Sequence, residues 1–194
     1  RSVELAKHFS VPLQVLSSFT GNPGTMIVKE YPSMEDIVVS GVAFNRNESK
    51  ISLIGVPDQP GMASRLFQAL GEADIPVDII VQNVGSQGRN DITFTTGRGD
   101  FKRAREVAEA FAREHSCERV EFEENVGKIS VVGIGMKSHS GVAATMFGAL
   151  AKAGINIEMI STSEIKISVI IDIDHIDQAV QAIHQEFALE NEPE

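Results

Sequence analysis

The sequence predicts an α+β fold built from two βαββαβ units, and three features of the chain predict it. The segments Ile51–Ile80 and Ile129–Ile160 share one pattern, in which an apolar strand precedes an amphipathic helix. In both copies, further strands and a second helix follow in the same order. The repeat is too long for a solenoid, so we interpret it as a duplicated small domain. The third feature is a strand pattern upstream of the first copy.

Matched residues fix the register between the two copies. Phe67 corresponds to Phe147, and Asp78 corresponds to Glu158. The predicted elements are strands over 51–56 and 129–134, helices over 62–73 and 142–153, strands over 77–84 and 157–162, strands over 91–95 and 165–171, and helices over 101–115 and 175–187. The helices repeat apolar residues at helical intervals, and the strands are rich in β-branched residues.

The two copies differ in their last strand. The first copy continues into a strand pattern at about Glu118–Glu123, whereas the residues after Phe187 are too acidic for a buried strand. Ile37–Phe44 is an unassigned strand pattern that ends at the turn residues 45–47. We therefore expect it to complete the second unit. A first unit of residues 48–124 would then be inserted within a second unit of residues 37–47 and 125–190. Each unit should have a four-stranded antiparallel sheet with both helices on one face.

The first 30 residues lie outside the repeat. Ser2–Phe9 has helical spacing, and Val11–Phe19 alternates as a strand does, before Gly21, Pro23 and Gly24 interrupt the pattern. These elements cannot bury their apolar faces alone. We expect residues 1–30 either to pack on the rest of the chain or to be the last element of an upstream domain, and residues 31–36 to be a linker.

Composition excludes several classes of function. The net charge of −10 would repel phosphate-rich partners, so we expect no nucleic-acid binding. No apolar run approaches the roughly 18 residues that a membrane helix needs, and we expect no membrane association. Cys117 is the single cysteine, which excludes an intrachain disulfide and favours a reducing, cytoplasmic location.

Motifs for catalysis are missing from the sequence. The five histidines have no spacing typical of a metal site, and there is no Cys-x-x-Cys, P-loop or Gly-x-Ser-x-Gly motif. We therefore predict no catalytic residue and no metal site in this chain.

The segment between the first strand and first helix of copy one suits a small ligand. Asp58 can accept hydrogen bonds or hold an ammonium group, Pro60 fixes the helix entry, and Gly61 lets the backbone approach a ligand. The positive end of the helix attracts a carboxylate. Together these groups match a zwitterionic amino acid, although such a loop is more often only a helix start. The corresponding loop 135–141 in copy two lacks the acid.

Polar residues also gather on the second strand of each copy. Asp78, Gln82 and Asn83 do so in copy one, and Asn156 and Glu158 do so in copy two. In this topology the second strand is an edge strand. Two interpretations stay open: the polar groups protect the edge from pairing, or they line a junction where two units pair side by side.

Several of these runs closely resemble the tandem ACT domains at the C-terminal end of aspartate kinase. The runs are VPDQPGMASRLFQAL, DIIVQNV, DITFT, GKISVVGIGMKSHSGVAATMF and INIEMISTSEIKISVII. The opening run RSVELAKHFSVPLQVLSSF, followed by NPGTMI, resembles the last helix and strand of the amino-acid-kinase domain of that enzyme. The likeness covers about residues 1–188.

The resemblance implies a regulatory part of an aspartate kinase. Such a part would bind end-product amino acids, L-threonine or L-lysine or both, between paired ACT domains, and would thereby control the phosphorylation of aspartate by ATP. It implies a homodimer formed through ACT domains and contact with a catalytic domain or α subunit. ATP and Mg²⁺ would bind there, so no cofactor is expected in this chain. An amino-acid-sensing ACT module of a different enzyme is the alternative.

The resemblance also implies a set of effector contacts. Matched position by position, they are Asp58, Met62, Ala63, Val77, Asp78, Gln82, Val142, Ala143, Asn156, Ile157, Ser163 and Glu164. Ala143 departs from the pattern, because some threonine-responsive relatives carry a hydroxyl residue there.

Overall fold

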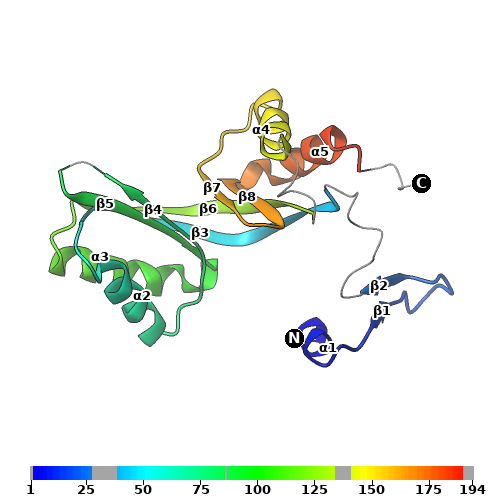
Figure 1. Ribbon diagram of the computed structural model, residues 1–194, viewed down its shortest axis with the longest axis horizontal. Helices are drawn as coiled ribbons and strands as arrows, with labels where there is room; N and C mark the ends of the chain where they lie inside the picture. The colour runs from blue at the N-terminus through cyan, green and yellow to red at the C-terminus, as the bar shows by residue number, and fades with distance from the viewer. Residues whose placement is uncertain (1, 28–38, 86, 134–140, 190–194) are drawn as a thin grey trace.

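The computed structural model describes residues 2–27, 39–85, 87–133 and 141–189. Its main body is a six-stranded antiparallel sheet with the strand order β4-β5-β3-β6-β8-β7 (Figure 1). The strands are β3 (Gly41–Pro57), β4 (Val77–Val84), β5 (Arg89–Thr96), β6 (Arg119–Val132), β7 (Met159–Thr162) and β8 (Lys166–Asp172). The helices of this body are α2 (Met62–Glu72), α3 (Phe101–Glu114), α4 (Val142–Lys152) and α5 (Ile176–Glu186), with short 3₁₀ turns η2 (Arg98–Asp100) and η4 (Ile173–His175).

The predicted α+β class is confirmed, but the prediction of two separate four-stranded sheets is wrong. β3 and β6 are long strands that run through both halves of one sheet. Residues 45–47 do not end the first strand, because the chain passes through β-bulges there and stays in the sheet. Likewise, the strands predicted at 118–123 and 129–134 form the single strand β6. Ile37, Val38 and Ile134 lie outside the described residues.

The strand segment upstream of the first copy pairs with the start of the second copy. Gly41–Asn45 of β3 pair with Lys128–Val132 of β6, whereas Lys50–Ile54 pair with Arg119–Glu123. Each half of the sheet therefore has four strand segments, two of them supplied by β3 and β6. This pairing is the one that an inserted arrangement of the two units requires.

Two hydrophobic cores lie between the sheet and its helices. α2 and α3 pack on β3 and β5 around Leu53, Leu66 and Phe94, which are fully buried. α4 and α5 pack on β6 and β8 around residues such as Ile129 and Met146. The helical intervals of the two repeats explain both cores, because every third or fourth residue of each helix faces the sheet.

The sheet bends so that the faces without helices meet. The two bulges between Asn45 and Lys50 mark where the bend lies. A third, smaller core of Ile79, Val126, Met159 and Ile170 joins β4 to β6, β7 and β8 across this inner side. Figure 1 shows the result, with α2 and α3 on one outer side of the molecule and α4 and α5 on the other.

The N-terminal elements are α1 (Ser2–His8), as the helical spacing predicts, β1 (Leu13–Val15), which covers only part of the predicted strand over 11–19, and β2 (Thr25–Ile27), which the patterns did not predict. α1 has no buried residue, and Phe9 and Phe19 are exposed. β1 and β2 form a separate two-stranded sheet. The predicted linker at 31–36 lies outside the described residues. None of the helices in the described ranges is long and apolar enough to cross a membrane.

Candidate functional site

A cavity of about 310 Å³ opens at the start of α2. Its wall is the loop from Val56 to Ala63, closed by three residues of β4 and β5, namely Gln82, Asn90 and Ile92. The volume is at the small end of the range for ligand pockets, which suits a small metabolite. β3 delivers the chain to this point, and α2 begins directly at the cavity.

The N-terminus of α2 presents unpaired amides to this cavity. Gly61 caps the helix at a φ of 94°, in the left-handed region that glycine tolerates, and no side chain caps the helix. The first intrahelical bond is donated by the Arg65 amide to the Gly61 carbonyl. The amides of Ala63 and Ser64 therefore have no partner within the helix. An anionic group is favoured at this position.

Two oxygen-bearing side chains, those of Asp58 and Asn90, also line this cavity. The amide of Asp58 donates to the Gly88 carbonyl at 2.8 Å, which fixes the loop on the β4–β5 turn. The side-chain Nδ2 of Asn90 donates to Oδ1 of Asp58, also at 2.8 Å. Asn90 is 6% exposed, and its Oδ1 is buried without a hydrogen-bond partner among the described residues. The cavity thus has an amide pole for an anion and a carboxylate pole for a cation.

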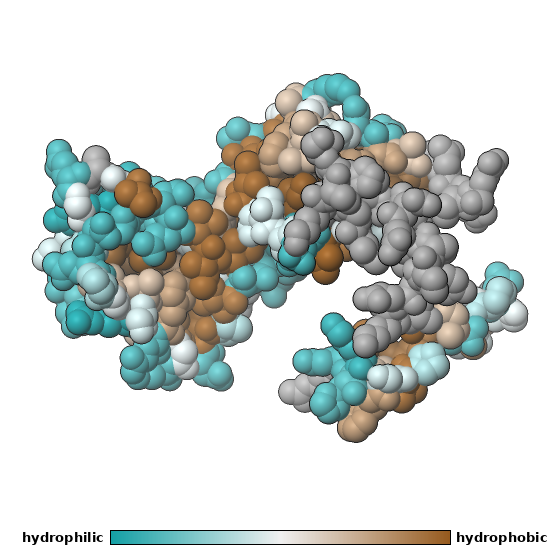
Figure 2. Space-filling view, in the orientation of Figure 1, coloured by the Kyte–Doolittle hydropathy of each residue, from teal (hydrophilic) through white to brown (hydrophobic). Residues whose placement is uncertain are grey.

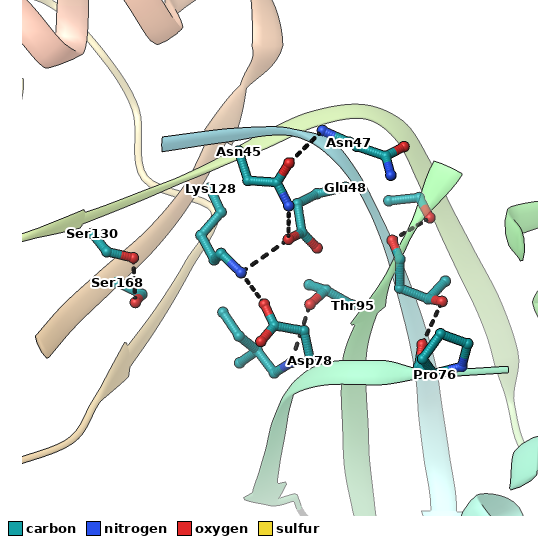
Figure 3. Close-up of polar contacts among 12 residues, drawn as sticks. Asn45, Asn47, Glu48, Pro76, Asp78, Thr95, Lys128, Ser130 and Ser168 are labelled. Atoms are coloured by element: carbon teal, nitrogen blue, oxygen red, sulfur yellow. Dashed lines mark hydrogen bonds and ion pairs between the residues drawn. The ribbon is translucent and has the colours of Figure 1, made fainter. Parts of the chain in front are cut away.

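A second polar cluster joins the two halves of the sheet, and we name it the junction cluster. It consists of Lys50, Glu123, Glu158, Lys128, Glu48 and Asp78. Lys50 Nζ lies 2.8 Å from Glu158 and 3.0 Å from Glu123. Lys128 Nζ lies 3.0 Å from Glu48 and also contacts Asp78 (Figure 3).

The junction cluster follows the internal repeat. Lys50 and Lys128 directly precede the first residues of the two copies, and Asp78 corresponds to Glu158. Each lysine bonds the acid of the opposite copy, so the exchange is reciprocal. Glu48 is 3% exposed, and Asn45 donates a further bond to it at 2.9 Å. The cluster therefore holds the two sheet halves together with hydrogen-bonded charges, of which Glu48 is buried and the two lysines are partly buried.

Titration of the junction cluster reflects this pairing. Burial lowers the pKa of Lys50, but the hydrogen bonds and charges of Glu158 and Glu123 outweigh it, so the pKa lies above its ordinary value. Burial likewise opposes the rise for Lys128, where Asp78 and Glu48 outweigh it. Burial raises the pKa of Glu158, whereas a hydrogen bond from Glu158 lowers the pKa of Glu123. The two acids shift in opposite directions, so their effects on stability in acid oppose each other.

Alkaline pH is expected to weaken the junction cluster. A lysine whose pKa is raised by folding stabilises the protein fully below its unfolded pKa of about 10.4, and that stability is lost as pH rises through the folded pKa. We expect the wild-type protein to lose more stability between about pH 9.5 and pH 11.5 than a Lys50→Met variant does. Thermal unfolding across this range measures the difference. Equal losses in both proteins would contradict the role of Lys50.

The cavity unites four of the predicted contacts of the first copy. Asp58, Met62, Ala63 and Gln82 all line it. The other two lie elsewhere. Val77 packs against the core under α2 and α3, and Asp78 contacts Lys128 in the junction cluster. Strict alternation would place Asp78 on the same face as Gln82, but β4 has a register shift between Val77 and Ile80, and Asp78 reaches the inner side of the sheet there.

The contacts predicted in the second copy are less concentrated. Val142 is buried in the core under α4 and α5, and Ala143 packs against that core. Ile157 also packs there, Asn156 is exposed, and Ser163 lies in the β7–β8 turn, where its amide donates to Lys166. Glu164 is exposed in the same turn. α4 begins at Gly141 with a φ of 113° and no side-chain cap, as α2 does, but the preceding loop 134–140 lies outside the described residues.

Sequence reasoning missed Asn90 and the two lysines. Asn90 takes a position on β5 whose side faces the core, two residues before Ile92 and four before Phe94. A polar residue at a position where the alternation expects an apolar one indicates a candidate functional residue. Lys50 and Lys128 repeat at the same point of both copies, as Asp78 and Glu158 do, and this double match was the signal for the junction cluster.

Comparison with known proteins identifies the repeated unit. A sequence profile of the ACT domain matches residues 51–111 and 129–187, which are the two copies of the repeat. The fold and this match together define a protein with two ACT domains.

Individual relatives narrow the family. An aspartate kinase of Stutzerimonas stutzeri is 48% identical over 191 residues, which are 98% of this chain and 46% of the relative. The regulatory subunit of aspartate kinase from Thermus flavus is 41% identical with a TM-score of 0.73, and the match covers 77% of this chain and 99% of that subunit. A chain from a crystal structure of aspartokinase alpha and beta subunits is 44% identical with a TM-score of 0.72, covering 78% and 99%. The chain belongs to the aspartate kinase family and corresponds to its regulatory region with ACT domains. It spans about half the length of the curated relatives it matches.

Proposed function

We propose that this chain is the feedback-regulatory part of an aspartate kinase and that it binds an end-product amino acid in the cavity at the start of α2. Binding would control the phosphorylation of aspartate by ATP in a catalytic domain or α subunit, where ATP and Mg²⁺ would also bind. The observation that carries the proposal is that the uncapped start of α2 and the side chains of Asp58 and Asn90 line one small cavity.

The two poles of the cavity suggest how the ligand lies. Its α-carboxylate would accept hydrogen bonds from the amides of Ala63 and Ser64, as anions do at helix N-termini. Its α-ammonium would lie against the carboxylate of Asp58. The side chain would then extend toward Gln82, whose amide can donate to a hydroxyl or accept from an ammonium. L-threonine and L-lysine are the ligands we propose, alone or together.

Edge strands supply the surface for a homodimer in this proposal. β4 and β7 are the two edges of the sheet, and corresponding isoleucines, Ile80 and Ile160, are 52% and 45% exposed on them. Val84 on β4 is 88% exposed. Figure 2 shows hydrophobic surface in the region of β4 and β7. Pairing of such edges with a second copy would cover these side chains and close the cavity between paired ACT domains.

The division of the chain is part of the same proposal. The first ACT domain would be residues 48–124, and the second would be residues 37–47 with 125–190. The pairing of Gly41–Asn45 with Lys128–Val132 supports it. Residues 1–30 would belong to the catalytic domain, which is consistent with the exposed apolar side chains of α1 and of the segment after β1. The single cysteine supports a cytoplasmic location.

Regulation would arise from a difference in affinity between two arrangements of the kinase. An amino acid that binds the inactive arrangement more tightly shifts the population toward it by that difference. Coupling energies of this kind are typically about 1–3 kcal/mol. An amino acid that binds both arrangements with equal affinity would leave the kinase activity unchanged.

Calorimetric titration tests the proposed function. The chain should bind L-threonine or L-lysine, and L-methionine serves as a comparison ligand. In the protein that joins this chain to its catalytic part, the same amino acid should bind and should also inhibit the phosphorylation of aspartate. An amino-acid-sensing module of another enzyme is the alternative, favoured if the ligand binds but aspartate phosphorylation is absent from the full protein.

A further inference from the structure

The orphaned oxygen of Asn90 is the feature of the cavity that the protein itself does not explain. Buried polar atoms in native proteins almost always have a hydrogen-bond partner. Among the buried side chains that the structure describes, Asn90 Oδ1 is the one such atom without a partner. Leaving a buried acceptor unpaired is unfavourable, so its retention indicates that a donor from outside the chain pairs with it.

The orientation of the Asn90 amide is set by its neighbour. Nδ2 donates to the Asp58 carboxylate at 2.8 Å. Reversing the amide would place Oδ1 against that carboxylate, where two acceptors would face each other without a proton. Oδ1 therefore lies on the side of the amide group away from Asp58, and Asn90 lines the cavity.

The position of Asn90 is rigid. Its backbone pairs with Val56 of β3 and with Val84 of β4, so strands flank it on both sides. Ile92 and Phe94 continue the same face of β5 and are 1% and 0% exposed. The side chain cannot turn to solvent without leaving this face. A ligand donor in the cavity is the way to satisfy the oxygen in place.

We propose that Asn90 Oδ1 and the Asp58 carboxylate together form a two-acceptor site for a primary ammonium group, and that Asn90 makes the cavity specific for α-amino acids. An ammonium has three N–H donors, which can serve both oxygens at once. The matching 2-hydroxy acid has one hydroxyl donor and no charge at this position, so it leaves one acceptor unpaired. The inference rests on the proposed function and extends it to a residue outside the predicted contacts.

Replacement of Asn90 by leucine separates this role from a purely structural one. Leucine has a similar size and removes both the orphaned acceptor and the donor to Asp58. We expect Asn90→Leu to keep the fold, as circular dichroism and unfolding would show, and to bind L-threonine and L-lysine about 10-fold to 100-fold more weakly than the wild type. Gln181→Leu is the control, since Gln181 is an exposed residue of α5, outside this cavity and away from the edge strands. It should bind as the wild type does.

The preference for an amino acid over its 2-hydroxy analogue is a measurement that would not change if Asn90 had only a packing role. Calorimetry should show that the wild type prefers each amino acid over its 2-hydroxy analogue and that Asn90→Leu narrows this preference about 10-fold. If the wild type binds an amino acid and Asn90→Leu binds it with the same affinity and selectivity, the role of Asn90 is overturned, whereas the proposed function is not. If the wild type binds neither amino acid, the proposed function and the role of Asn90 both fail. An Asn90→Leu chain that does not fold is replaced by Asn90→Val, which also removes both polar atoms, suits a strand, and should narrow the preference in the same way.

Discussion

Replacement of Lys128 by methionine is expected to lower the free energy of unfolding by about 3–5 kcal/mol, the usual cost of removing one partner from a buried ion pair. The reason is Glu48, which is 3% exposed and would lose the lysine that pairs with its carboxylate, leaving the Asn45 amide as a donor. Asp78 would lose the same partner at the edge of the junction cluster. Urea unfolding followed by circular dichroism measures the change.

Two further variants show whether the loss comes from the buried charge. Lys152→Met removes an exposed ion pair with Glu186 on the outside of α4 and α5, and it should cost at most about 1 kcal/mol. The double variant Lys128→Met/Glu48→Gln removes the stranded charge and should recover part of the loss. A Lys128→Met variant as stable as Lys152→Met would contradict the structural importance of the junction cluster.

The second large effect is expected at Asp58. Asp58→Asn keeps an oxygen to accept from Asn90 but removes the charge that would hold the ligand ammonium. Hydrogen bonds to charged groups contribute about 1.5–3 kcal/mol, so affinity for L-threonine or L-lysine should fall by about 10-fold to 150-fold. Calorimetric titration measures it. The stability of the free protein should change little, because the Asp58 side chain is at the surface.

Asp74→Asn is the matched control for this charge removal. Asp74 lies at the far end of α2 with a φ of 53°, a conformation that asparagine also tolerates. The variant loses the same unit of charge but lies away from the cavity, so its affinity should equal that of the wild type. If both variants weaken binding equally, the effect is one of net charge, and the ligand lies elsewhere.

Local patterns predicted the helices and several strands well. The intervals of Leu66, Leu70 and their counterparts in copy two placed α2 and α4, and alternation placed β4 at the residues it occupies. The count of strands also predicted that a segment before the first copy pairs with the second. These features are encoded within short stretches of sequence, where periodicity decides the structure.

The course of the sheet could not be predicted in the same way. Asn45, Arg46 and Asn47 are turn-forming residues, yet the chain passes through them in bulges because both sides continue to pair with β6. The bend that follows brings Lys50 to Glu158, which is 108 residues away. Contacts of this kind depend on the tertiary fold, so the pairing of Asp78 with Lys128 could not be predicted from local patterns.

The candidate site was predicted in part for the same reason. Asp58, Met62 and Ala63 are neighbours in sequence, and a helix start brings them together by itself. Gln82 and Asn90 reach the cavity only because β4 and β5 pair beside β3. Asn90 follows the long turn between these strands, and no local pattern connects it with Asp58.

Nuclear magnetic resonance of the ¹⁵N-labelled chain tests the central claim most directly, because it observes the amides that would hold the ligand. Titration with L-threonine or L-lysine should shift the Ala63 and Ser64 amide signals and the Asn90 side-chain amide signal, with one saturable dissociation constant for all three. The signals of α5, on the far side of the molecule, should move little. Saturable shifts confined to other parts of the chain, with these three signals unmoved, would contradict the account.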